Sequence, residues 1–267
     1  MKHGSTISQI LSLTLVLFLG LSVLPKTCTA EDMDEPPTLF GSFLKDMGVE
    51  ISGGATMDYY DRYVWRGQYL DRDSVLQPGI SFSTLGFTVG YWGSFDMENG
   101  DSLTSDESDY YVSYGYTLDP VTVSVGHTWY DFPEYDGSSK EFFVSVAVDT
   151  LLSPTFSVFH DYEDGKDLNT DGDGNYYTLA LSHSVPLCEK TGIALDLGLT
   201  FGYVDGQWLS GEGTHLTPTI GLNIPLTPNL TIIPTIGYNA PMGDLEDADI
   251  GNQEDKVFGG IKTAFAF

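Results

Sequence analysis

Residues Ile193 to Tyr203 alternate without exception between large apolar side chains and small or polar ones. The odd positions carry Ile, Leu, Leu, Leu, Phe and Tyr, and the even positions carry Ala, Asp, Gly, Thr and Gly. A period of two places each set on its own face of a β-strand. Residues 177–185 and 121–129 repeat the alternation, with one histidine each on the apolar face. Bulky apolar residues facing lipid and small polar residues facing a lumen are typical of transmembrane β-barrels.

Segments of this kind predict about twelve strands along the chain. The predicted strands are 49–67, 75–84, 87–97, 108–118, 121–132, 141–152, 155–162, 175–187, 193–204, 214–226, 230–241 and 256–267. Short connections alternate strictly with longer loops, which are 68–74, 98–107, 133–140, 163–174, 205–213 and 242–255. The fold class predicted is all-β: a transmembrane antiparallel up-and-down β-barrel of about 12 strands, with short periplasmic turns and longer extracellular loops. A secreted β-sandwich, the alternative, would not require this alternation of loop lengths.

Three prolines fall inside the predicted strands, at Pro78, Pro218 and Pro234. Each removes a ladder hydrogen bond, and a closed barrel has no edge strand on which to place it. We therefore expect these prolines at bulges or strand ends.

The chain begins with an export signal. A short basic start is followed by an almost unbroken apolar run from Ile10 to Leu24, and Cys28-Thr29-Ala30 supplies small residues before Glu31. This pattern predicts a cleaved signal peptide over 1–30. A lipoprotein signal acylated at Cys28 is the alternative. Residues 31–48 are then a flexible acidic periplasmic leader, and 49–267 the barrel.

The charge of the chain excludes one class of partner. Lys and Arg number 11 against 38 Asp and Glu, which gives a formal net charge of −27. Removal of Lys2 and Lys26 with the signal peptide leaves 9 basic against 38 acidic residues, a net charge of −29. Nucleic acid requires a basic face, so it is not an expected partner.

Aromatic residues gather toward the long-loop ends of the predicted strands, where a girdle at the membrane interface is expected. The members expected there include Tyr110, Tyr111, Phe142, Phe143, Tyr176 and Tyr177. The last strand, KVFGGIKTAFAF, ends on Phe267. A terminal aromatic of this kind resembles the signal that the outer-membrane assembly machinery reads. The expected location is the outer membrane of a Gram-negative bacterium.

Residues 59–97 contain a strand ending in Trp65-Arg66-Gly67, a second strand with Pro78, and a third with Trp92-Gly93. Downstream lie the acidic and aromatic segments SDYYVSYGYTLD and HTWYDFP. These segments resemble the TorF family of porins, most clearly over about 59–165. The resemblance implies an outer-membrane barrel with a pore function. It supplies no substrate and no site residues, because the family is poorly characterised.

Charged residues on the small, polar face of the strands are the candidates for the lumen or its constriction. They are Arg62, Arg66, Asp96, Asp149, Asp196 and Lys262. Charged groups are tolerated in a lumen and are costly on the lipid face. They either form a transverse field that selects solutes by charge, or pair and plug a narrow barrel.

Two other patterns are weaker. Asp167, Asn169, Asp171 and Asp173 match the first ligands of a calcium loop, but position 12 is Thr178 and not the usual Glu. A weakly bound extracellular calcium is therefore possible there, and no cofactor is required. Ser182 and His183 are adjacent on a strand and point to opposite faces, so they cannot act as a nucleophile and its base. We expect no enzymatic activity.

The sequence thus predicts an outer-membrane porin or channel for small hydrophilic solutes, biased toward cations by its acidic surface. The alternative is a non-conducting barrel that acts as a scaffold or surface-interaction protein. Expected partners are outer-membrane lipid and lipopolysaccharide, the outer-membrane assembly machinery and small solutes.

Overall fold

The computed structural model describes residues 50–98, 106–133, 137–163, 173–207 and 211–267. The predicted signal peptide and leader lie outside this range and stay predictions. The elements are β1 (Ser52–Tyr60), β2 (Tyr63–Trp65), β3 (Gln68–Asp71), β4 (Val75–Thr84), β5 (Phe87–Asp96), β6 (Glu107–Leu118), β7 (Val121–Phe132), β8 (Gly137–Val148), β9 (Thr155–Glu163), β10 (Gly174–Cys188), β11 (Ile193–Asp205), β12 (Glu212–Pro225), β13 (Leu230–Gly243) and β14 (Lys256–Ala266). No helix in the described ranges is long and apolar enough to cross a membrane.

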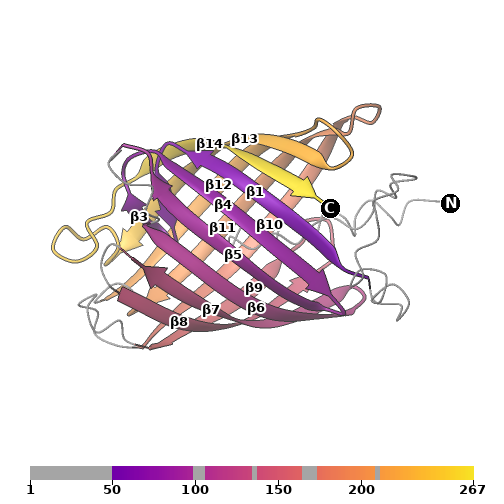
Figure 1. The fold of residues 1–267 in the computed structure, drawn as a ribbon. Coiled ribbons are helices and arrows are strands. Elements are labelled where there is room, and N and C mark those ends of the chain that lie inside the picture. The colour runs from indigo at the N-terminus through magenta and orange to yellow at the C-terminus, as the bar shows by residue number, and fades with distance from the viewer. Residues whose placement is uncertain (1–49, 99–105, 134–136, 164–172, 208–210) are drawn as a thin grey trace.

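All strands except β2 and β3 form one closed antiparallel barrel, in which each strand pairs with its neighbours in the chain and β1 pairs with β14 (Figure 1). The predicted fold class of a twelve-strand antiparallel barrel is therefore confirmed. The end of β14 lies at the barrel end with the short turns, and the long loop between β13 and β14 lies at the opposite end.

Most predicted strand bounds agree with the structure to within two residues, and two do not. The strand expected at 141–152 is β8, which runs from Gly137 to Val148. The strand expected at 49–67 ends at Tyr60, because the chain leaves the barrel wall at Asp61 and enters a separate two-stranded hairpin. This second difference concerns the candidate site.

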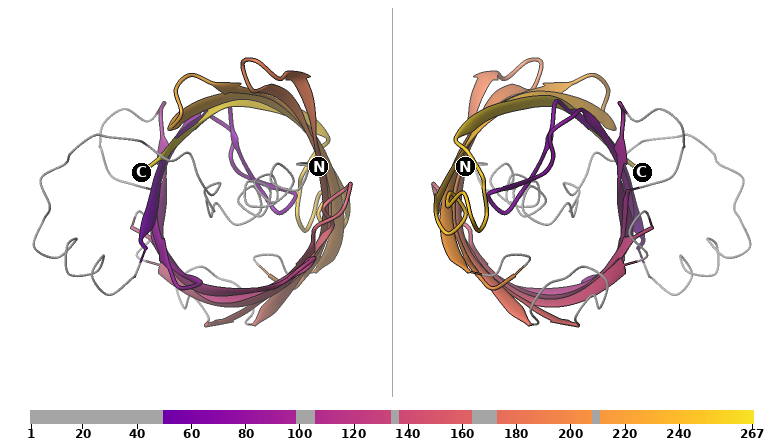
Figure 2. Two further views of the ribbon diagram at one scale, coloured as in Figure 1. Left: turned by 90° about the vertical axis from the view of Figure 1, so that its right-hand side faces the viewer. Right: turned by 90° about the vertical axis from the view of Figure 1, so that its left-hand side faces the viewer.

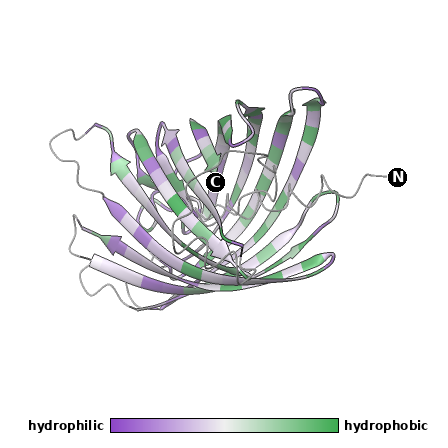
Figure 3. Ribbon diagram, turned by 45° about the vertical axis from the view of Figure 1, so that its right-hand side comes forward, coloured by the Kyte–Doolittle hydropathy of each residue, from purple (hydrophilic) through white to green (hydrophobic). Residues whose placement is uncertain are grey.

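Hydrophobic and hydrophilic residues alternate along the barrel strands (Figure 3), and their side chains lie on opposite faces of the wall. On β8, Phe142, Val144 and Val146 are exposed on the outer surface, whereas Glu141 and Ser145 are buried on the inner one. β4, β7 and β11 also expose apolar side chains at every second position. Apolar residues facing outward lower the free energy of the wall in lipid, and the backbone groups are paired between strands.

The inner face is less uniformly small and polar than predicted. The inward-facing large aromatics include Tyr111, Tyr130, Phe143, Phe159, Tyr176 and Phe258. Tyr111, Phe143 and Tyr176 were expected in the interface girdle, as was Tyr130, and that expectation is wrong. Each of these residues is next in the sequence to an outward-facing aromatic residue. Because successive side chains of a strand point to opposite faces, its own side chain points into the lumen. The lumen therefore contains a partly aromatic core.

The three prolines are accommodated within strands. β4 pairs continuously with β1 through Pro78, but its pairing with β5 is interrupted between Leu76 and Gly79. β12 pairs with β11 through Pro218, and its ladder with β13 is interrupted between Leu216 and Thr219. Both prolines thus lie where the pairing with one neighbouring strand is interrupted. The missing N–H therefore costs no ladder hydrogen bond on that side.

Candidate functional site

The hairpin of β2 and β3 lies inside the ring of barrel strands (Figure 2). It occupies the first long connection, between β1 and β4, and we call residues 61–74 the lumen hairpin. Its turn has two central residues, Arg66 with φ 49° and Gly67 with φ 81°. Positive φ at both positions matches the twist of a tight two-residue hairpin turn, but costs a non-glycine residue about 1–2 kcal/mol. Arg66 therefore adopts a strained backbone at the tip of the hairpin.

The side chain of Arg66 is held by a carboxylate of the barrel wall. Its Nη1 lies 2.6 Å from Glu141 Oε2, and its Nη2 lies 2.9 Å from Glu141 Oε1. Gln207 accepts a further hydrogen bond from Nη1 and donates one to Glu141, and Tyr130 donates another to Glu141. Arg66 is 8% exposed and Glu141 is fully buried. A forked, buried pair of this kind is much stronger than one at a surface.

Burial is the largest single influence on the pKa of Arg66 and lowers it, but the charge and hydrogen bond of Glu141, together with Tyr130 and Tyr176, raise the pKa by more in total. Arg66 is thus a permanent cation inside the lumen. Removing either partner alone would leave an uncompensated buried charge, which typically costs about 3–5 kcal/mol.

Three aromatic rings cover the guanidinium. Its carbon lies 4.3 Å from the ring centroid of Trp65, 4.4 Å from that of Phe159 and 4.6 Å from that of Tyr176. Trp65 belongs to the hairpin, and the other two belong to β9 and β10 of the wall. Rings at these distances attract a cation through their negative faces. We call Glu141, Phe159 and Tyr176 of the wall, together with Gln207 just after β11, the Arg66 cage.

The other tip residue, Gly67, is fitted against the opposite wall. Its carbonyl oxygen accepts a hydrogen bond of 2.8 Å from Asn239 Nδ2 of β13. A Cβ atom at Gly67 would lie 2.7 Å from His215 Cβ of β12. His215 in turn contacts the Tyr176 hydroxyl, 2.8 Å from Nε2. The tip of the hairpin therefore touches both sides of the lumen.

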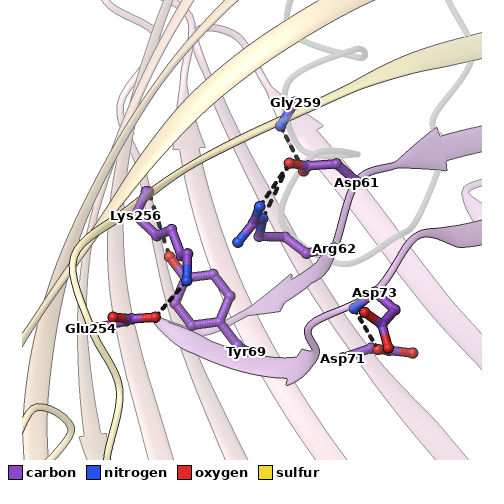
Figure 4. Close-up of polar contacts among 8 residues, drawn as sticks. All are labelled: Asp61, Arg62, Tyr69, Asp71, Asp73, Glu254, Lys256 and Gly259. Carbon is purple, nitrogen blue, oxygen red and sulfur yellow. Dashed lines mark hydrogen bonds and ion pairs between the residues drawn. The ribbon is translucent and has the colours of Figure 1, made fainter.

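The base of the hairpin is anchored at the barrel rim (Figure 4). Asp61 accepts a hydrogen bond from the Gly259 amide at 2.9 Å and pairs with Arg62 at 3.0 Å. The Tyr69 amide donates to Gln253 Oε1 at 2.8 Å. A nearby rim pair joins Lys256 and Glu254, and the hydrogen bond from Lys256 lowers the pKa of Glu254.

Two further carboxylates lie on β6 beside the hairpin. Glu107 and Asp109 are 5% and 8% exposed, and Arg66 attracts both. Tyr63 of the hairpin forms a hydrogen bond with Glu107. Together with Glu141, they place three buried carboxyl groups near the guanidinium of Arg66.

The six lumen candidates do not form one constriction. Arg66 lies at the hairpin tip and Arg62 at its base. Lys262 of β14 interacts electrostatically with Asp58 and Asp196, in a second charged group.

The two remaining candidates lie apart from both groups. Asp96 ends β5 at the long-loop rim, where its carboxylate accepts a hydrogen bond from the Glu98 amide. Asp149 follows β8 at a short turn, and its amide donates to Pro120.

Most residues around Arg66 could not be selected from the sequence. Glu141, Gln207, Glu107 and Asp109 are among these, and Glu107 lay in the predicted loop 98–107. The alternation placed Glu141 and Asp109 on inward faces, and this is the signal that could have found them.

The two weaker patterns remain predictions. Asp167, Asn169 and Asp171 lie outside the described residues, and Asp173 is exposed just before β10. Within the described ranges, no group of three or more His, Cys, Asp and Glu could hold a metal ion. His183 Nδ1 lies 2.9 Å from the Leu151 carbonyl oxygen, whereas Ser182 is buried on the inner face.

No family model matches the chain, and no curated protein matches it. Solved structures of similar fold include the NanC porin, with a TM-score of 0.50 and 13% identity, covering 80% of this chain and 98% of that one. The KdgM porin, also solved in complex with disordered oligogalacturonate, has a TM-score of 0.49 and 10% identity over 81% of this chain and 99% of its own. An outer-membrane channel from Pseudomonas putida F1 has a TM-score of 0.46 and 10% identity, over 81% and 95%.

The fold is therefore that of a transmembrane β-barrel of the outer-membrane type. In this chain, the first long connection forms the lumen hairpin.

Proposed function

We propose that the protein is an outer-membrane channel for small hydrophilic solutes, in which the lumen hairpin forms the constriction. The observation that carries this proposal is the closed barrel whose inner face holds buried carboxylates, hydroxyls and amides around an inserted hairpin. Polar inner walls lower the cost of passage for hydrated solutes. The resemblance of residues 59–97 to the TorF family of porins supports the same function.

The preference for cations is part of the proposal. Glu107, Asp109 and Glu141 surround the constriction, where Arg66 compensates one of the three charges. A narrow point governs selectivity more than the mouth of a pore does, because an ion is least hydrated there. We propose that passing solutes meet a net negative constriction.

The hairpin also supports the second candidate, a non-conducting barrel. A hairpin that contacts both walls, at Glu141 and at Asn239, reduces the open cross-section. In that case the barrel would display its long loops to partners outside the cell.

Planar bilayers distinguish the two functions. Purified full-length mature protein should give discrete conductance steps, and Arg66→Ala should enlarge them because the hairpin loses its ion pair. Arg62→Ala is the matched control, since Arg62 forms its ion pair with its neighbour Asp61 at the rim and not with the cage. Absence of steps in the unmodified protein at every salt concentration and voltage would favour the scaffold.

A further inference from the structure

The cage around Arg66 has the features of a binding site for a separate ligand. Glu141 presents both carboxylate oxygens to the two terminal nitrogens of the guanidinium, at 2.6 and 2.9 Å. This fork is specific for a planar guanidinium, because an ammonium ion offers a point charge without two parallel donors. The recognition is thus one of shape as well as of charge.

The wall alone supplies this recognition. Glu141, Phe159 and Tyr176 belong to barrel strands and Gln207 follows β11, so none of them is part of the hairpin. Glu141 is positioned by Tyr130 and Gln207 independently of the hairpin. The rings of Phe159 and Tyr176 are tilted relative to each other, with centroids 5.7 Å apart. If the hairpin left the lumen, a carboxylate and two ring faces would stay in place to receive another guanidinium.

The hairpin also has contacts outside the cage. Its tip accepts a hydrogen bond from Asn239, and Tyr69 of its second strand donates hydrogen bonds to Gln253 and Lys256. Asp61 at its base is bonded to Gly259. The positive φ of Arg66 opposes the docked turn and costs about 1–2 kcal/mol. Loss of the cage interaction would therefore favour release of the hairpin.

The surrounding charge favours a cationic ligand. Glu107 and Asp109 remain near the cage as buried carboxyl groups that Arg66 attracts. Carboxyl oxygens accept hydrogen bonds from a guanidinium, whereas the cage offers no basic side chain to an anion.

We infer that Glu141, Gln207, Phe159 and Tyr176 form a guanidinium-binding site, occupied in this structure by the chain's own Arg66. A solute that carries a guanidinium group competes with Arg66 and displaces the lumen hairpin. Passage of the solute after the hairpin is displaced is the one part of the inference that rests on the proposed channel function. Binding and displacement themselves do not require conduction.

Equilibrium binding tests the site. The probes are methylguanidinium and, as the control of equal charge, methylammonium, at matched ionic strength in detergent-solubilised mature protein. Arg66→Ala empties the cage, so methylguanidinium should bind it about tenfold tighter or more than it binds the unmodified protein, since Arg66 no longer competes. Adding Glu141→Gln to Arg66→Ala should abolish this binding. Equal affinity for the two probes would contradict the proposed site. An affinity for methylguanidinium that Arg66→Ala does not raise would contradict it as well.

A spin label tests the displacement without touching the cage. Leu70 of β3 is exposed, so Leu70→Cys can carry the label in a Cys188→Ser background. Methylguanidinium should increase the mobility of the label, and methylammonium should not. A label that stays immobile at saturating methylguanidinium contradicts displacement. This measurement also serves if Arg66→Ala fails to give a heat-modifiable barrel. A protein that binds and releases the hairpin yet never conducts would refute the channel and leave the site intact.

Discussion

The last residue of the chain, Phe267, is paired with Gly53 at the seam that closes the barrel. The Gly53 amide donates to the Phe267 carbonyl oxygen at 2.8 Å, and the Phe267 amide donates back at 3.1 Å. The ring of Phe267 covers the α-carbon of Gly53, where a Cβ atom would overlap it, and packs against Phe82 with centroids 5.8 Å apart. The C-terminal aromatic therefore fixes the first and last strands together.

Gly53→Ala should destabilise the barrel by about 1–3 kcal/mol, the usual cost of an overpacked contact, because the added methyl group overlaps the Phe267 ring. Gly115→Ala is the matched control, since a Cβ atom there would meet Ser124 Oγ at 3.4 Å, an ordinary contact. The midpoint of urea unfolding of the refolded barrel reports both. Equal midpoints for the two variants would show that Phe267 simply moves aside.

Deletion of Phe267 should impair assembly more than it impairs synthesis. The deletion removes the hydrogen bonds to Gly53 and the ring contact with Phe82, and it also removes the predicted assembly signal. Phe156→Ala is the control, because Phe156 is another exposed aromatic near a short turn. The measurement is the amount of heat-modifiable barrel in the outer-membrane fraction. Normal amounts after the deletion would contradict the prediction.

The barrel could be predicted from the sequence because its outer face must be apolar at every second residue. That requirement acts within each strand, so the alternation of apolar and polar residues is enough to predict β11 and β12 from the sequence. The offset of β8 arose because Gly137, Ser138 and Ser139 have no apolar alternation, although they pair with β7.

The lumen hairpin could not be predicted, because residues 61–67 alternate as a continuation of β1 would. The one local signal is the pair Arg66-Gly67, because a glycine in second position is typical of a two-residue hairpin turn. Such turns usually have Asn or Asp in the first position, and here that position is Arg66. The partner of Arg66 is Glu141, 75 residues away. A contact of that separation depends on how the closed barrel places its walls, which alternation does not specify.

Gly67→Ala should enlarge the conductance without preventing assembly. Its φ of 81° and the nearby His215 leave no room for a methyl group, so the hairpin tip is forced from the wall. Gly86→Ala is the control, because Gly86 also has a positive φ, of 85°, but lies in a short turn outside the lumen. Single-channel recordings should separate the two: an equal change in both variants would attribute the effect to turn strain alone.

Processing of the chain gives a prediction that depends on the sequence alone. Cleavage after Ala30 should leave Glu31 as the first residue of the mature protein, because Cys28-Thr29-Ala30 presents small residues to the signal peptidase. Intact-mass spectrometry of protein from the outer-membrane fraction measures this. An acylated chain beginning at Cys28 would instead identify a lipoprotein.

The last prediction concerns ion preference. A conducting barrel should favour cations at neutral pH, because the chain has 38 acidic residues against 11 Lys and Arg. The charges of the loops at the mouth add to this, but their reach falls from ~10 Å in 0.1 M salt to ~3 Å in 1 M salt. The buried carboxylates are screened less than those at the mouth. Selectivity should therefore weaken in concentrated salt without disappearing.

Reversal potentials under a KCl gradient measure this preference. Glu107→Gln combined with Asp109→Asn should shift the reversal potential toward anions, because Arg66 and Glu141 then balance each other. Glu254→Gln at the rim is the control, and its effect should be smaller and vanish at 1 M salt, because Glu254 is exposed and fully screened. If the unmodified pore prefers anions, Arg66 governs the constriction instead. If the rim variant shifts the potential as much as the double variant, the mouth and not the hairpin is the filter.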